Sequence, residues 1–81
     1  MITKLKLPRV GENVSSVFIV ELPISIGSKF NKDDILMLVE TDKATVEIVA
    51  PCSGTLTEYL VRNDEEITFG QPYAIIDTHE L

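Results

Sequence analysis

Apolar and polar residues alternate with a period of two along most of the chain, which is the pattern of half-buried β-strands. In the first run, Leu5 and Leu7 fall on one face and the lysines on the other, and Pro8 ends the strand. Phe30 and Ile67 are expected to anchor a core. Strands are predicted over 2–8, 17–22, 35–40, 45–49, 55–61 and 73–76, with 24–26 as a short continuation and 77–81 as a frayed end. No helical period extends beyond a turn or two, so we expect an all-β fold.

The chain contains an internal repeat, because a shift of 37 residues brings its two halves into correspondence. Under this shift Gly27 falls on Asp64, and both residue types accept turn conformations. We expect one domain over 1–81, with a first half of about 1–41 and a second of about 44–78. Each half provides about four short strands, too few to bury both edges alone. Halves related by a pseudo-two-fold axis predict a flattened sandwich or barrel of two four-stranded antiparallel sheets.

The two halves are joined at a predicted hairpin that carries Lys43. Two β-rich runs flank it, leaving Asp42 and Lys43 to make the turn. A two-residue hairpin turn favours positive φ, which strains a lysine by about 1 kcal/mol. A lysine at a hairpin tip is by itself usually a solvated charge. The expected strain is what suggests that this one is placed to hold its amine away from the protein body.

The repeat is interrupted by six extra residues near Val10 to Ser16 in the first half, because Pro8 matches Pro51 only at an offset of 43. This stretch is polar and contains glycine and asparagine, so it is expected to be a surface loop. The pseudo-two-fold arrangement predicts that the loop lies beside the lysine hairpin and that both chain ends lie far from it.

Composition and charge narrow the function classes. The 81 residues carry 7 basic and 13 acidic side chains, a net charge of -6, which argues against binding to nucleic acid or to an anionic membrane. No apolar run approaches the roughly 20 residues of a membrane span, and the first residues lack a secretory signal pattern. Cys52 is the single cysteine, so a reducing compartment is expected. No residue set has the spacing of a metal site or a catalytic triad.

Three spaced residues carry a resemblance to a known family. Gly27 is followed sixteen residues later by Lys43, within Glu-Thr-Asp-Lys-Ala, and eleven residues further by Gly54. Together with the repeat, this pattern resembles the lipoyl domain of the dihydrolipoamide acyltransferase component of 2-oxo acid dehydrogenase complexes. The resemblance covers residues 2 to about 77. It departs at Asn63, where many members have glycine, and at a proline that ends the second predicted strand.

The resemblance implies a carrier without an active site of its own. Lipoic acid, amide-linked to Lys43 by an attaching enzyme, would be a swinging arm that carries acyl groups and electrons. It would serve a thiamine-diphosphate 2-oxo acid decarboxylase, an acyltransferase core and dihydrolipoamide dehydrogenase. The parent would be a dihydrolipoamide acyltransferase of the bacterial cytoplasm or the mitochondrial matrix, and the isolated domain a monomer. Partners would read the residues around the lysine, namely Glu40, Thr41, Asp42 and Ala44.

Three alternatives to the lipoyl domain of an acyltransferase stay open. Biotinyl carrier domains share the architecture, but their lysine usually lies between methionines, whereas Lys43 lies between Asp42 and Ala44. The glycine-cleavage hydrogen carrier bears lipoate but is typically longer, with helices. An unmodified interaction module of the same fold is the third. The particular 2-oxo acid complex is not readable from this stretch, and the end at 79–81 suggests a domain excised from a longer chain.

Overall fold

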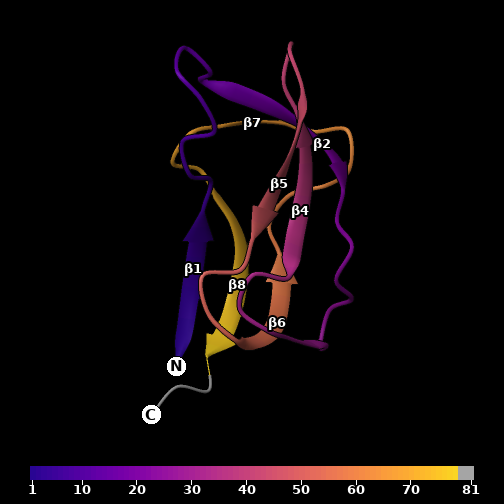
Figure 1. The fold of residues 1–81 in the computed structure, drawn as a ribbon. Helices are drawn as coiled ribbons and strands as arrows, with labels where there is room; N and C mark the ends of the chain where they lie inside the picture. The colour runs from indigo at the N-terminus through magenta and orange to yellow at the C-terminus, as the bar shows by residue number, and fades with distance from the viewer. Residues whose placement is uncertain (79–81) are drawn as a thin grey trace.

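A computed structural model describes residues 1–78, which form eight β-strands and no helix, so none that could cross a membrane (Figure 1). The strands are β1 (Ile2–Lys6), β2 (Ser16–Glu21), β3 (Lys29–Phe30), β4 (Ile35–Glu40), β5 (Thr45–Val49), β6 (Gly54–Tyr59), β7 (Glu66–Thr68) and β8 (Pro72–Thr78). They make two four-stranded sheets, ordered β1-β8-β6-β3 and β5-β4-β2-β7, with antiparallel neighbours throughout. The predicted fold class is confirmed.

The internal repeat of the sequence is a symmetry of the strand order. The first half supplies β1 to β4 and the second β5 to β8. The repeat makes β1, β2, β3 and β4 the counterparts of β5, β6, β7 and β8. If each strand is exchanged for its counterpart, the order β1-β8-β6-β3 becomes β5-β4-β2-β7, which is the order of the other sheet. Each sheet therefore combines two strands from each half, so neither four-stranded sheet can form from one half alone.

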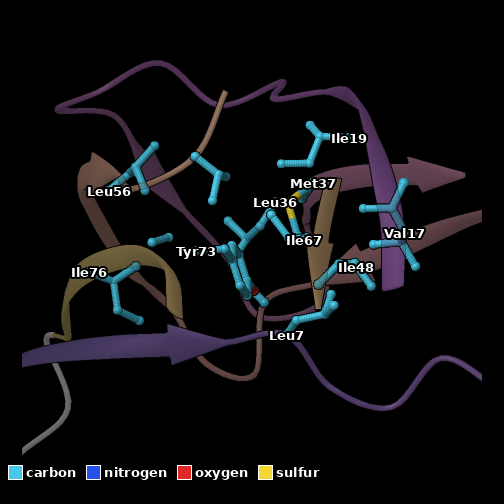
Figure 2. Close-up of a cluster of buried hydrophobic side chains, with 14 of the residues drawn as sticks. Leu7, Val17, Ile19, Leu36, Met37, Ile48, Leu56, Ile67, Tyr73 and Ile76 are labelled. Atoms are coloured by element: carbon cyan, nitrogen blue, oxygen red, sulfur yellow. The ribbon is translucent and has the colours of Figure 1, made fainter. Parts of the chain in front are cut away.

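The core lies between the two sheets and is built from the inward-facing residues of the alternating strands. Figure 2 shows Leu36, Ile67 and Tyr73 gathered in the middle of this layer. Phe30 and Ile67, the expected anchors, are both buried. Each large side chain of this kind contributes about 1.5–3 kcal/mol when it is removed from water. The alternation read from the sequence therefore identifies the buried face correctly.

The predicted continuation over 24–26 is wrong, because this stretch is a loop between β2 and β3. The backbone N–H of Ile24 donates to the hydroxyl of Tyr59, at 3.3 Å, instead of to a neighbouring strand. The same hydroxyl donates to the carbonyl oxygen of Leu36 at 2.7 Å. Tyr59 thus links this loop to β4. Pro23, which has no backbone N–H to donate to a neighbouring strand, lies in the loop and not in a sheet.

The frayed end predicted from residue 77 is also wrong where the structure describes it. β8 continues to Thr78, and Asp77 pairs with Ile2 on one side and Thr55 on the other. The reason is topological: β8 is an inner strand, so neighbours on both sides hold its last residues in the ladder. The rest of that predicted end, 79–81, lies outside the described residues.

Gly27 and Gly54 are explained by the geometry of the backbone, as expected from the sequence. A Cβ on Gly54 would lie 2.7 Å from the backbone oxygen of Asp77, a separation that real Cβ atoms do not show. Gly27 and its repeat counterpart Asp64 both have positive φ, +89° and +68°. Asp accepts this conformation at a modest cost, so the turn survives in both halves without a second glycine.

Candidate functional site

The hairpin between β4 and β5 lies at one end of the molecule, whose longest extent is 38 Å (Figure 1). The N-terminus and the end of β8, the last described strand, lie at the opposite end (Figure 1). Lys43 occupies the four-residue connection between Glu40, the last residue of β4, and Thr45, the first of β5. The predicted separation of the lysine from the chain ends is confirmed for the N-terminus and for the end of β8, and residues 79–81 lie outside the described part of the chain.

The turn itself differs from the prediction. Neither Asp42 nor Lys43 has a positive φ, so the strained two-residue turn expected from the sequence is wrong. The hydroxyl of Thr41 explains the difference. Its oxygen accepts the backbone N–H groups of Lys43 and Ala44, at 3.2 and 3.1 Å, and its O–H donates to the carbonyl of Ala44 at 3.0 Å. A side chain that captures the turn amides in this way replaces a strained backbone turn.

The backbone hydrogen bond that closes the hairpin also connects Thr41 and Ala44. The N–H of Thr41 donates to the carbonyl oxygen of Ala44 at 2.8 Å. Below this bond, Glu40 pairs with Thr45 and Val39 with Val46, which continues the β4–β5 ladder. The lysine therefore projects from a turn whose base is held by four hydrogen bonds, all of which involve Thr41.

The side chain of Lys43 is exposed, and so are its neighbours Asp42 and Ala44. The ion pair found among residues 1–78 joins the N-terminal amine to Asp77, and neither Lys43 nor Asp42 takes part in one. An amine that is neither buried nor held by a carboxylate can enter another protein's active site and become an amide. The residues present thus fit a covalently attached acyl cofactor. In the same described range, no group of side chains is placed to hold a metal ion.

The loop of six extra residues lies beside this hairpin, as the pseudo-symmetry predicted. A shallow hollow separates the two, and its lining comes from the loop, β2 and the hairpin: Asn13, Val14, Ser15, Ser16, Phe18, Glu40, Thr41 and Asp42. Glu40, Thr41 and Asp42, three of the four residues expected to be read by partners, therefore meet on one surface. Ala44 does not line this hollow, but it lines a second, more open depression together with Lys43 and the same three residues.

Phe18 belongs to this surface and was not singled out from the sequence. It lies between the buried residues Val17 and Ile19, so its ring points outward and is 52% exposed. Its neighbours across the strands are Glu40 on β4 and Glu66 on β7. The sequence does contain a signal for Phe18, because the alternation predicts a polar residue at this position and an aromatic residue stands there instead.

Contacts at both ends hold the loop against the sandwich. The guanidinium of Arg9 stacks over the ring of Phe69, with 4.4 Å from its central carbon to the ring centroid. The N–H of Phe69 donates to the carbonyl of Ser15 at 3.0 Å, and the N–H of Gly70 donates to that of Leu7 at 2.9 Å. The loop thus keeps a defined position beside the lysine.

Two tyrosines of the core region have displaced pKa values. Burial, with a smaller contribution from the nearby Tyr59, raises the pKa of Tyr73 to about 12. Burial also raises the pKa of Tyr59, against the smaller effect of its bond from Ile24. Both phenols are neutral at physiological pH and serve as packed, hydrogen-bonding core groups.

The sequence of the chain matches a known family and several characterised proteins. The sequence model of the family described as "Biotin-requiring enzyme" matches residues 3–76. The chain is 36% identical over 76 residues to a probable dihydrolipoyllysine-residue succinyltransferase component of the mitochondrial 2-oxoglutarate dehydrogenase complex of Schizosaccharomyces pombe, covering 94% of this chain and 17% of that protein. It is also 36% identical over 77 residues to the dihydrolipoyllysine-residue acetyltransferase component of the pyruvate dehydrogenase complex of Staphylococcus epidermidis, covering 95% and 18%.

Two solved structures share the fold at low sequence identity. A single-chain, multi-domain long-chain acyl-CoA carboxylase matches with a TM-score of 0.82 at 16% identity, over 99% of this chain and 7% of that one. The lipoyl domain of the 2-oxoglutarate dehydrogenase complex of Azotobacter vinelandii matches with a TM-score of 0.73 at 19% identity, over 91% and 94%. The chain thus corresponds to nearly all of an isolated domain but to less than a fifth of the two curated relatives named above.

Proposed function

The chain belongs to the family of biotin- and lipoyl-bearing carrier domains, and on that premise we propose that it is a lipoyl domain with Lys43 as its attachment residue. The relatives that share about a third of its residues are acyltransferase components of 2-oxo acid dehydrogenase complexes, which supports lipoate over biotin. The observation that carries the assignment of Lys43 is its exposed amine, free of any ion pair described in residues 1–78, on a hairpin tip at the far end from the N-terminus and from the end of β8.

The chemistry comes from the cofactor, and the chain provides position. Lipoic acid, when bound, supplies a dithiolane that accepts an acyl group together with two electrons. Thr41 holds the backbone of the lysine, so the arm starts from a fixed point while its own bonds rotate. Conversion of the amine to an amide takes the net charge from -6 to -7 and removes the single positive charge of the turn. Tethering raises the effective concentration of the carried group at each partner to about the millimolar range.

The parent protein and its partners follow from the relatives as proposals. The chain covers 17% of the first curated relative and 18% of the next, so the acyltransferase activity would reside in another domain of a longer chain. We expect that parent to be a dihydrolipoamide acyltransferase. Its domain would be served by an attaching enzyme, a thiamine-diphosphate 2-oxo acid decarboxylase and dihydrolipoamide dehydrogenase. The relatives include mitochondrial and bacterial proteins, which supports the mitochondrial matrix or the bacterial cytoplasm.

The surface around Lys43 would identify this lysine to its partners. We propose that Glu40 and Asp42, both exposed carboxylates, are contacted directly, and that Ala44 keeps bulk away from the amine. Thr41 would act through the turn, since its hydroxyl is engaged by backbone groups. Neutralising Glu40 or Asp42 should therefore slow modification and leave the fold intact, because neither carboxylate is buried.

Coexpression with a lipoate ligase or with a biotin ligase, followed by intact mass and peptide mapping, tests the assignment. We expect lipoate to be added once, on Lys43, and biotin not to be added. The variant Lys43→Arg should remain unmodified, whereas Lys29→Arg, which changes an exposed lysine at β3, should be modified like the wild type. Biotin on Lys43, lipoate on another lysine, or no lipoate while an authentic lipoyl domain is modified in parallel would each contradict the proposal.

A further inference from the structure

The hollow between the 10–16 loop and the hairpin has a volume of about 260 Å³ and begins at the base of the lysine turn. Thr41 and Asp42, the two residues that precede Lys43, form one of its walls. Asn13, Val14 and Ser15 of the loop form the other. A long, flexible group attached to the amine of Lys43 therefore has two concave surfaces beside its turn: this hollow and the more open depression that Lys43 itself lines, and of the two only the hollow is lined by large apolar side chains.

The hollow offers apolar surface with hydrogen-bonding groups around it. The ring of Phe18 is half exposed there, and the side chain of Val14 is half buried. The remaining lining is made of hydroxyl, amide and carboxylate side chains. An aromatic ring left half in water on an outer strand face has no role in the core described above. It offers a contact to a ligand that is partly apolar.

The hollow is held open by contacts on both sides. On the loop side, Ser15 accepts the N–H of Phe69 at 3.0 Å, and the hydroxyl of Ser16 donates to Glu66 at 2.9 Å. On the hairpin side, the hydrogen bonds of Thr41 hold the turn. A preformed surface spares a bound group the cost of ordering the loop.

We propose that this hollow is a resting site for the lipoyl group of Lys43, the domain's own cofactor. The inference rests on the proposed function. The group is a saturated eight-carbon acyl chain that ends in a cyclic disulfide, and it is uncharged, so Glu40 and Asp42 on the rim do not repel it. Its sulfur atoms are suited to the ring of Phe18, because sulfur–aromatic contacts are favourable. Its hydrocarbon chain is suited to Val14, and the tether makes binding intramolecular.

Occupancy of this site would make the arm alternate between two states. In one state, the dithiolane ring of the lipoyl group rests on Phe18 and is partly shielded from reagents in solution. In the other, it extends from the hairpin and is available to a partner. A partner that covers the hollow would release the arm toward its own active site. The contact surface is small, so the resting state would be only a few times more populated than the extended one.

The rate at which a phosphine reductant opens the dithiolane measures this shielding. The lipoylated wild type is compared with lipoylated Phe18→Ala, after intact mass has verified modification of both. Glu40 and Asp42 are unchanged in the two proteins, so their repulsion of an anionic phosphine cancels. We expect reduction of the wild type to be slower by about threefold. Ile26→Ala, which removes an exposed apolar side chain outside the hollow, should reduce like the wild type.

Nuclear magnetic resonance gives a second readout on the unaltered protein. The ring resonances of Phe18 should shift between the unmodified and lipoylated domains, while those of Phe69, equally exposed but outside the hollow, should not. If Phe18→Ala is not accepted by the attaching enzyme, Val14→Ser replaces it in the reduction assay. Equal reduction rates, an unshifted Phe18 ring, or a shift that appears only when a partner enzyme is added would overturn the resting site. Absence of lipoylation in the wild type would instead refute the proposed function.

Discussion

Replacing Thr41 by valine removes one hydroxyl and keeps the branched shape of the side chain, so it tests how the lysine turn is held. The hydroxyl makes three hydrogen bonds of 3.0 to 3.2 Å to the backbone of Lys43 and Ala44. Each such bond contributes about 0.5–1.5 kcal/mol net, and water can reach this turn, so the lower part of that range applies. We therefore expect Thr41→Val to lower the free energy of unfolding by about 1–2 kcal/mol.

Urea denaturation followed by circular dichroism measures this loss, and thermal unfolding should show a decrease of about 4–8 °C per kcal/mol for a domain of this size. Thr41→Ser keeps the hydroxyl and should lose much less. Thr45→Val, an exposed threonine at the start of β5, is the matched control and should stay within about 0.5 kcal/mol of the wild type. The rate of lipoylation should fall for Thr41→Val and be largely retained for Thr41→Ser. A valine variant as stable as the wild type, or a serine variant equally impaired, would refute the role given to the hydroxyl.

Gly54→Ala should destabilise the domain by about 1–3 kcal/mol, because the new Cβ meets the backbone of Asp77 at 2.7 Å; Gly11→Ala, whose Cβ would have only a 3.5 Å contact, is its control in the same urea titration. Wild-type stability should decrease between pH 10 and about 12, because the raised pKa of Tyr73 favours the neutral phenol in the folded state and ionisation favours unfolding. Tyr73→Phe should remove about 2 kcal/mol of that alkaline loss, measured as urea midpoints across this pH range. Arg9→Ala should cost about 0.5–1 kcal/mol through its contact with Phe69, and Arg9→Lys less, since an ammonium can also lie over the ring.

The position of the lysine could be read from the chain because it depends on local and repeated patterns. Period-two alternation identifies which face of a strand is buried, and the shift of 37 residues identifies equivalent strands, so the hairpin between the halves follows. Gly27 and Asp64 were matched in the same way, and both have the positive φ that their shared turn needs. The expectation that Lys43 carries the cofactor stays a prediction until modification is measured.

Other features depend on which strands become neighbours, and alternation does not encode this. The end of β8 is ordered because β1 and β6 flank it, although the sequence near Asp77 looks like a tail. The unstrained turn depends on one hydroxyl reaching two amides, a three-dimensional detail that turn statistics missed.

The chain by itself thus determined six of the eight strands, their repeat and the residue at the apex of the central hairpin, because these follow from side-chain chemistry at short and regular spacings, whereas the short strands β3 and β7 were read only as the core anchors Phe30 and Ile67. Only the tertiary structure decided that both sheets are shared between the halves and that Phe18 and Val14 meet the hairpin across a hollow. These contacts join residues more than twenty positions apart. They arise from the pairing of β2 with β4, and the sharing of the sheets arises from pairs between the halves such as β2 with β7; alternation along the chain does not specify either pairing.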